Sequence, residues 1–493
     1  MSRFNSTTVG TRTTNFAGGR AYKEDAKLEI ASILLNSFVT DQYYRSADNT
    51  MRRLVELIET LPDKRFAAQA ALFARTKYNL RSISHVAAGE VARLVKGEQW
   101  TKRFFAAVVQ RPDDATEILS YYTTKYGKPI PNSLKKGLAA GLTKFDGYQL
   151  AKYRGEDKTL SLIDLVNITH PVPSAKNTEA LKQLIEGTLK NTDTWEAKLT
   201  EAGKSAESDE DKADLKAEAW AELITNRKLG YMATLRNLRN LVEQVKDESV
   251  IKQALETLAD PNQVRRSRVL PFRFYTAYQQ MSQVSGANKV LKALSTALDH
   301  SVGNLPEMPG KTLVVIDHSG SMDSRMSGNS QATMFQTGAL LGVSLAKSQD
   351  ADLIYFGDTA RYFTFNPADS ILSIMMALEE ANRWGGATSV GHGTNFEAAF
   401  NTATKAYDRI VIFSDMQGWM GYRTPTTAFN AYKKRTGANP TVFSVDLAGY
   451  GTLQFPEDRV FCLAGFSEKT LELLPKLEVD KNALVHEIEE VEV

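Results

Sequence analysis

The chain has 493 residues, of which 42% are hydrophobic and 24% charged, an ordinary composition for a soluble protein of two or three domains. No apolar run reaches the length of a membrane span, and the polar N-terminus has no apolar core of a secretory signal, so a membrane location is not expected. The single cysteine, Cys462, allows no internal disulfide, which is consistent with the cytoplasmic location that we expect.

The net charge of +2 is unevenly distributed along the chain. Residues 1–310 hold 45 Lys and Arg against 36 Asp and Glu, a net of +9, whereas residues 311–493 hold 15 against 22, a net of −7. A basic first part joined to an acidic second part suggests a polyanionic partner for the first part. A solvated helical surface with an excess of lysine is the alternative interpretation.

Residues 1–20 are polar and predict a flexible arm, and residues 21–305 have an almost wholly helical pattern. Apolar residues recur at helical spacing, and the breaks between helices are short and rich in Gly, Pro or Asn. This pattern predicts an all-α domain of packed antiparallel helices, an α-solenoid. The first seven expected helices span 25–38, 50–61, 63–77, 82–95, 100–110, 114–126 and 131–142.

Two segments interrupt this helical pattern. Residues 190–220 are highly charged and predict a helical hairpin with a mobile tip near 205–211, with disorder as the alternative, and helix resumes over 232–258. The Pro- and Gly-rich run at 302–310 predicts a linker. It ends in Gly310-Lys311-Thr312, which imitates a phosphate-binding loop, but a strand rather than a helix follows, so we reject a nucleotide site there.

From Lys311 onward, apolar strands alternate with helices, which predicts an α/β domain over 306–493, with a largely parallel sheet covered on both faces. The acidic tail from Glu487 to Val493 is expected to remain outside the core. The expected strands are 312–316, 352–356, 361–365, 409–413, 441–447 and 459–463, and the expected helices are 330–348, 370–382, 395–406, 425–436 and 467–475.

Three loops of this second domain offer oxygen ligands. Asp317, Ser319 and Ser321 follow the first strand at alternate positions, Thr394 follows a Gly-rich turn, and Asp415 ends the strand that begins near Asp408. The carboxyl edge of such a sheet is where ligands bind. Carboxylate and hydroxyl oxygens suit Mg²⁺, which keeps several waters. The alternative is an acidic loop that caps the next helix.

These five residues resemble the metal-ion-dependent adhesion site of von Willebrand factor A domains, which have a Rossmann-like α/β fold. The resemblance implies that Asp317, Ser319, Ser321, Thr394 and Asp415 hold Mg²⁺ or another divalent cation. It also implies an open coordination position for an oxygen of a partner.

The helical part has its own resemblance, carried by three segments. The first segment is a basic helix end at 150–158, followed by a short helix at 160–165 and by Thr169-His170-Pro171. The second is Leu235-Arg236-Asn237-Leu238, and the third is Ser267–Phe272 (SRVLPF). In this order, before an A domain, they are similar to the TROVE module of the Ro ribonucleoprotein family. The resemblance covers nearly the whole chain and implies a ring of HEAT-like helical repeats over 21–305, followed by the A domain.

The resemblance to the Ro family implies an RNA-binding protein. Family members bind small structured Y RNAs on the ring surface and admit single-stranded 3′ ends of misfolded RNA into the ring hole. They act in RNA quality control, and bacterial members are similar to adaptors for an exoribonuclease. On the matching positions the RNA contacts are Lys152, Lys158 and His170, with Arg154 beside them. We expect a monomeric ring.

Two other classes of function are open. A metal-dependent protein-interaction scaffold without a specific RNA role would use the A domain to recruit an acidic ligand, with the helices as a frame. An enzyme is not expected, because the sequence has no HExxH, no paired cysteine ligands and no complete phosphate-binding loop. Asp317 and Ser319 could be imagined as a hydrolase pair, but only His318 adjoins Ser319, and adjacent loop residues point apart.

Overall fold

The structure is a computed structural model of the whole chain. It describes residues 12–15, 18, 20–23, 26–35, 47–155, 158–189, 195–326, 330–418, 420–448, 452–453, 459–464, 471, 474–479 and 483–493. These pack into two compact units. The N-terminal helical unit comprises Asp25–Val39, Ser46–Asp193 and Asn482–Val493, and the C-terminal unit comprises Met1–Glu24, Thr40–Arg45 and Thr194–Lys481.

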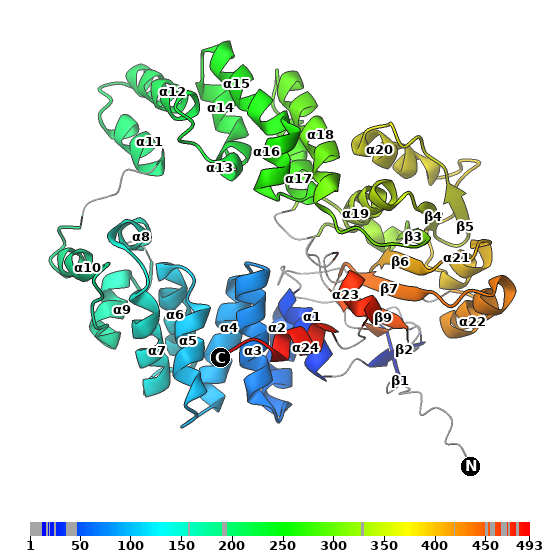
Figure 1. Cartoon of the computed structure of the whole chain (residues 1–493), viewed down its shortest axis with the longest axis horizontal. Helices are drawn as coiled ribbons and strands as arrows, with labels where there is room; N and C mark the ends of the chain where they lie inside the picture. The colour runs from blue at the N-terminus through cyan, green and yellow to red at the C-terminus, as the bar shows by residue number, and fades with distance from the viewer. Residues whose placement is uncertain are drawn as a thin grey trace. The chain divides into compact units, whose positions relative to one another are not determined.

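In the N-terminal helical unit, helices adjacent in sequence or next but one pack against each other, as the solenoid pattern predicts: α3 with α4, α4 with α6 and α5 with α7 (Figure 1). Gly137 allows a close approach, because a Cβ there would lie 2.4 Å from the Cβ of Phe105. The helices are α1 (Ala26–Leu35), α2 (Ala47–Thr60), α3 (Lys64–Lys77), α4 (Ser82–Leu94), α5 (Trp100–Val108), α6 (Pro112–Tyr126), α7 (Asn132–Leu142), α8 (Gly147–Lys152), α9 (Leu162–Thr169), α10 (Thr178–Ile185) and α24 (Ala483–Glu489).

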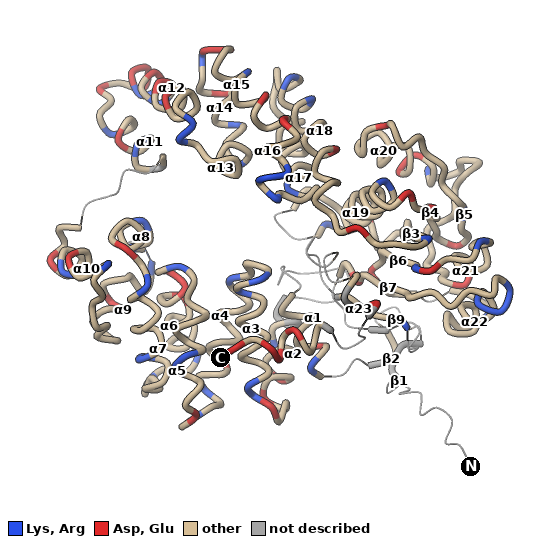
Figure 2. The backbone as a smooth tube through the Cα atoms, viewed as in Figure 1, with Lys and Arg blue, Asp and Glu red and all other residues tan. Residues whose placement is uncertain are grey.

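Helix α24 corrects one expectation, that the acidic tail stays outside the core. Leu484, Ile488 and Val493 are buried, and α24 packs on α1 and α3. The side-chain amide of Gln69 donates to the backbone carbonyl of Glu489 at 2.5 Å. The tail alternates apolar residues with glutamates (red in Figure 2), so its apolar side chains are buried while Glu489, Glu490 and Glu492 are exposed.

Helices α11 to α18 belong to the C-terminal unit. The predicted hairpin is present as α11 packed on α12, and the turn between them covers 205–208. The helices are α11 (Trp195–Lys204), α12 (Asp209–Thr225), α13 (Tyr231–Arg236), α14 (Leu238–Gln244), α15 (Glu248–Ala259), α16 (Pro261–Ser267), α17 (Pro271–Met281) and α18 (Asn288–Ser301).

The C-terminal unit also contains the expected α/β sheet, in the order β5-β4-β3-β6-β7-β9. Its pairings are parallel except for β4 with β5, so the predicted largely parallel sheet is confirmed. The strands are β3 (Thr312–Asp317), β4 (Asp352–Phe356), β5 (Ala360–Phe363), β6 (Arg409–Ser414), β7 (Thr441–Asp446) and β9 (Val460–Ala464). Strands β3, β6 and β7 are buried along their whole length, as strands covered on both faces must be.

The helices of the sheet domain are α19 (Met334–Gln349), α20 (Ile371–Ala381), α21 (Phe396–Thr402), α22 (Pro425–Thr436) and α23 (Leu474–Val479). Four match the expected helices, and the expected helix over 467–475 lies largely outside the described residues. Helix α19 packs against α17, where Gln279 donates to Gln336 at 3.0 Å. In the expected linker, Val302–Asn304 form the 3-10 helix η1, and Leu305 and Met308 are buried. The two compact units divide near residue 194, within the helical region, so this division does not test the expected domain boundary at 302–310, which stays a prediction.

A second, small sheet involves the start of the chain. Strand β1 (Arg12–Thr14) pairs with β2 (Arg20–Lys23), which pairs with β8 (Thr452–Leu453). The buried side chain of Asn15 donates to the backbone carbonyl of Gly418 at 2.9 Å. Part of the expected arm is therefore attached to the loop that follows β6.

Candidate RNA-contact loop and candidate metal centre

The loop between α8 and α9 carries three of the four residues expected to contact RNA. Lys152 is exposed at the end of α8, the guanidinium of Arg154 donates to the carbonyl of Leu189 at 2.9 Å, and the ammonium of Lys158 lies 3.1 Å from a carboxylate oxygen of Glu117. The backbone closes the loop, since the amide of Leu162 donates to the carbonyl of Arg154 at 2.8 Å. The structure therefore brings Lys152, Arg154 and Lys158 onto one loop.

His170 lies at the opposite end of α9. It is exposed, ends the helix in the left-handed conformation with φ 48°, and its amide donates to the carbonyl of Val166. Because an eight-residue helix is about 12 Å long, His170 is separated from Arg154 and Lys158 by roughly that length. The structure therefore places His170 apart from the other three expected RNA contacts.

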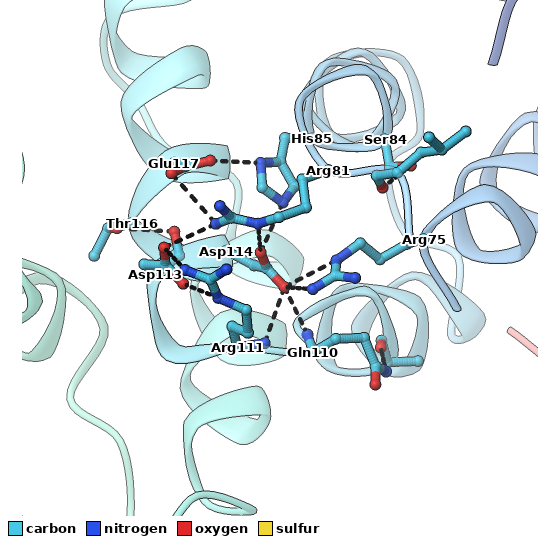
Figure 3. A network of polar contacts seen from close by, with 12 residues as sticks. Arg75, Arg81, Ser84, His85, Gln110, Arg111, Asp113, Asp114, Thr116 and Glu117 are labelled. Carbon is cyan, nitrogen blue, oxygen red and sulfur yellow. Dashed lines mark hydrogen bonds and ion pairs between the residues drawn. The ribbon is translucent and has the colours of Figure 1, made fainter. Parts of the chain in front are cut away.

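A buried polar network lies beneath this loop, and sequence reasoning missed it (Figure 3). At its centre, the fully buried carboxylate of Asp114 accepts hydrogen bonds from Arg75 at 2.8 Å and Arg81 at 2.9 Å, and lies 3.1 Å from His85 Nε2. Asp114 also accepts from the backbone amides of Gln110 and Arg111, both at 2.9 Å. The network joins α3, α4 and the start of α6, because each helix contributes at least one charged partner.

Two contacts connect the network with the loop above it. The guanidinium of Arg111 lies 4.2 Å from the ring centroid of Tyr153, and Glu117 contacts His85 at 3.0 Å as well as Lys158. The only signals in the sequence were two acidic residues after Pro112, a common helix start, and a histidine within an apolar helix. Neither signal indicates which cations converge on them.

The network predicts how stability depends on pH. Burial disfavours the charged forms of both His85 and Asp114. The Asp114 and Glu117 carboxylates nevertheless raise the pKa of His85. His85 and Arg75 in turn hold the pKa of Asp114 well below its usual range. The hydrogen bond from His85, opposed by burial and aided by Arg81 and Lys158, lowers the pKa of Glu117 to about 2.

Each shift has a defined sign. The contribution of His85 is fully present below its ordinary pKa near 6.5 and is lost as pH rises through its raised folded value; the contribution of Glu117 is present above pH 4.5 and is lost towards pH 2. We therefore expect the urea midpoint of the N-terminal helical unit to fall when pH rises from 5.5 to 8. His85→Gln should remove this fall, and an unchanged pH profile in the variant would contradict the assignment.

The candidate metal centre lies at the carboxyl edge of the α/β sheet, where neighbouring parallel strands β3 and β6 end. Asp317 is the last residue of β3, and Asp415 directly follows β6. The hydroxyls of Ser319 and Ser321 lie 3.3 Å apart, the amide of Ser319 donates to Asp317 at 2.9 Å, and the Ser321 side chain is close enough to Asp415 to counter the effect of burial on its pKa. These four side chains therefore converge at one edge.

The third expected loop is linked to the other two through its backbone. The carbonyl of His392 accepts from the amide of Gly320 at 2.9 Å, and the carbonyl of Thr394 accepts from Met420 at 3.2 Å; Thr394 itself is buried. Sequence reasoning missed Asn382, whose amide donates to the carbonyls of His318 at 3.0 Å and Gly391 at 3.1 Å and so joins two of the loops. A single asparagine at the end of a helix carries no sequence signal for that role.

The donor set fits a hard divalent cation. Asp317 and Asp415 are fully buried side by side, and Asp415 Oδ2 has no hydrogen-bond partner within the described residues. Burial, with the neighbouring carboxylate of Asp415, raises the pKa of Asp317 to about 7, and burial also raises the pKa of Asp415. A cation would remove the repulsion that these shifts reflect. In the described chain no three His, Cys, Asp or Glu side chains form a metal cluster, so hydroxyls and waters must complete the set.

Two exposed aromatic residues flank this edge. The side chain of Trp384 is 83% exposed and its ring stacks on His392, with centroids 5.2 Å apart. Tyr422 is fully exposed and lies two residues beyond Met420, which bonds Thr394. Aromatic residues are enriched at protein interfaces relative to the rest of the protein surface.

Comparison with protein families identifies both parts of the chain. The TROVE domain matches residues 30–215 and 188–299, and the Ro60 vWA domain matches residues 311–477. Among the helices that the structure describes, none is both long and apolar enough to cross a membrane.

Individual relatives share less than a quarter of the aligned residues with this chain. The chain is 24% identical to RNA-binding protein RO60 of Deinococcus radiodurans over 331 residues, 60% of this chain and 61% of that protein. It is 23% identical to telomerase protein component 1 of Rattus norvegicus over 348 residues, 53% of this chain but 13% of that protein. It is 23% identical to RNA-binding protein RO60 of Caenorhabditis elegans over 215 residues, 42% of this chain and 33% of that protein. The chain thus spans less than two thirds of each of these relatives.

A solved structure has the same fold along most of the chain. The crystal structure of the Deinococcus radiodurans RO (RSR) protein superposes with a TM-score of 0.61 and covers 94% of this chain and 99% of that one, at 19% identity. The helical region followed by an α/β domain is therefore the architecture predicted from the sequence. With the two family domains in this order over most of its length, the chain belongs to the Ro family.

Proposed function

We propose that this protein binds RNA through its helical region. Its ligands would be small structured, Y-like non-coding RNA and the single-stranded 3′ ends of misfolded RNA. It would act in RNA quality control or as an adaptor for an exoribonuclease, as a binding protein and not as an enzyme. The observation that carries the proposal is the TROVE domain over residues 30–299 of a part of the chain with a net charge of +9.

The α8–α9 loop is the proposed RNA contact. Lys152 and Lys158 are exposed. Among the described residues, Lys158 forms one ion pair, with the partly exposed Glu117; such a pair stabilises the fold little and can be exchanged for a phosphate contact. Tyr153 is half-buried beside Arg111, and this contact holds the end of α8 that bears Lys152. A backbone segment that is already held in place loses little conformational entropy when it binds.

The test is the double substitution Lys152→Ala and Lys158→Ala in the full chain. Affinity should fall across RNA sequences, and the slope of log affinity against log salt should flatten by roughly 0.7–0.9 for each phosphate that is no longer neutralised. Lys252→Ala with Lys289→Ala, which removes two exposed lysines from α15 and α18, is the charge-matched control. His170→Ala should weaken binding with less effect on the salt slope, because a neutral imidazole releases no counterion.

If the double variant and its control lose affinity equally, the α8–α9 loop is not the contact and only net charge matters. If RNA affinity is unchanged in both proteins, the proposed site is wrong. Filter binding over a salt series measures all of these quantities.

For the A domain we propose a bound Mg²⁺. Asp317, Ser319, Ser321, Thr394 and Asp415 would hold it, directly or through water, with the unpartnered Oδ2 of Asp415 as the supporting observation. The cation would supply a Lewis-acidic position for an oxygen of a partner.

Exposed Trp384 and Tyr422 favour a second candidate function, a metal-dependent scaffold that recruits an acidic protein ligand at this edge. A pull-down with and without nuclease distinguishes the two functions, because a defined RNA should co-purify only if the RNA proposal holds.

A further inference from the structure

A pocket of about 440 Å³ at the α11–α12 hairpin gathers three lysines. Lys204 is the last residue of α11, and Lys212 and Lys216 belong to α12 (Figure 1). The other polar side chains that line it include Asn240 and Gln244 of α14, and no acidic side chain is among the lining residues. The pocket lies in the C-terminal unit, whereas the α8–α9 loop belongs to the N-terminal helical unit.

The two lysines of α12 lie on its inner face. Lys212, Lys216 and Trp220 are spaced by four residues and therefore share one side of the helix. This side faces α11, because a Cβ on Gly203 would lie 3.3 Å from Cε of Lys216 and 3.6 Å from Cε of Lys212. Gly203 thus leaves room for two lysine stems where hairpin partners usually pack apolar side chains.

Charge makes this arrangement unfavourable without a ligand. Like charges four residues apart on a helix destabilise it. Over residues 195–326, Lys198 pairs with Glu222 and Lys246 with Asp214, whereas no carboxylate forms an ion pair with any of the three pocket lysines.

The floor of the pocket is rigid and offers hydrogen-bond donors. Trp220 is buried, stacks on Trp195 with centroids 5.9 Å apart, and donates its indole N–H to Oε1 of Gln244 at 3.0 Å. This bond fixes the orientation of the Gln244 amide and directs its NH₂ group away from Trp220. Asn240 is exposed one helical turn away, so two amides can reach the edge of a base.

We propose that this pocket binds the phosphate of a nucleotide, with Lys204, Lys212 and Lys216 as its counter-charges and Asn240 and Gln244 as hydrogen-bond partners of the base. Its volume is within the range of small-ligand sites. The nucleotide is either free or one residue of a single-stranded RNA. Only the RNA form rests on the proposed function, where the pocket would be a second contact besides the α8–α9 loop.

The experiment uses the full chain and two probes, fluorescein-labelled decauridylate and uridine monophosphate. Lys212→Ala with Lys216→Ala removes two charges, and Gly203→Leu fills the space while leaving the charge unchanged. Leucine is a better helix former than glycine, so the second variant retains the hairpin. Both should weaken decauridylate binding about tenfold, the lysine variant because it removes two counter-charges of the phosphate and Gly203→Leu because its side chain occupies the pocket. The Lys252→Ala with Lys289→Ala control should change it less than twofold.

The outcomes separate the sources and the hypotheses. Loss of uridine monophosphate binding in the pocket variants, with decauridylate unaffected, supports the free nucleotide; loss of both, or of decauridylate alone, supports RNA. If the pocket variants bind both probes as the control does, or if the wild-type protein binds decauridylate only through Lys152 and Lys158, the inference is overturned while the proposed function stands. If the wild-type protein binds uridine monophosphate but no RNA, and the pocket variants no longer bind uridine monophosphate, the proposed function fails and the pocket stands.

Discussion

Asp114→Ala should destabilise the N-terminal helical unit by about 3–5 kcal/mol, because it leaves the buried Arg75 guanidinium without a counter-charge. Arg75 is 4% exposed and Asp114 fully buried, so water cannot replace the missing carboxylate. The same change removes the acceptor of two backbone amides at the start of α6. A lowered urea midpoint of the helical circular dichroism signal is the measurement.

The control for this prediction is Glu186→Ala in the same unit. Glu186 is exposed at the end of α10, where a carboxylate is unfavourable to the helix dipole, so its removal should change stability by less than about 0.5 kcal/mol. Arg75→Met with Asp114→Leu should recover only the part of the stability that is lost through the unpaired Arg75 charge, because Asp114→Leu still removes the acceptor of Arg81 and of two backbone amides. Equal midpoints for Asp114→Ala and Glu186→Ala would contradict the structure of the network.

Asp415→Asn should have opposite effects with and without metal. In the presence of a chelator the variant should be more stable than the wild type, because it removes one of two adjacent buried carboxylates. Addition of Mg²⁺ at a hundredfold excess over its dissociation constant should stabilise the wild type by about 2.7 kcal/mol, or about 5–10 °C in Tm for a domain of this size. The variant should show no such shift.

Asp369→Asn, at an exposed carboxylate outside the three loops, should respond to Mg²⁺ like the wild type. Scanning calorimetry in chelator and in Mg²⁺ gives both values. A Tm of the wild type that does not change with Mg²⁺, or an equal shift in Asp415→Asn, would remove the metal proposal without affecting the RNA proposal.

The elements that the sequence predicted well are those whose pattern is local. Strands β3, β6 and β7 are continuous apolar runs, and burial on both faces requires such runs. The convergence of Asp317, Ser319, Ser321 and Asp415 also follows from topology, because parallel neighbours end at the same edge. Once β3 and β6 are neighbours in the sheet, the loops that follow them must lie at the same edge.

Features that depend on distant partners were not predictable. Arg75 and His85 lie within helices of ordinary pattern, and only folding brings them to Asp114. The burial of α24 depends on a face offered by α1 and α3, near the start of the chain. The lysine pocket is defined by the absence of a side chain at Gly203, which no charge pattern reveals.

The most direct test of RNA binding by the helical region is a filter-binding series over salt, with one RNA that has a single-stranded 3′ tail and one blunt duplex. The wild-type protein should bind the tailed RNA more tightly, and Lys152→Ala with Lys158→Ala should weaken binding and flatten the salt dependence. Equal affinity of both proteins for both RNAs at every salt concentration would contradict RNA binding by this region and favour the scaffold function instead.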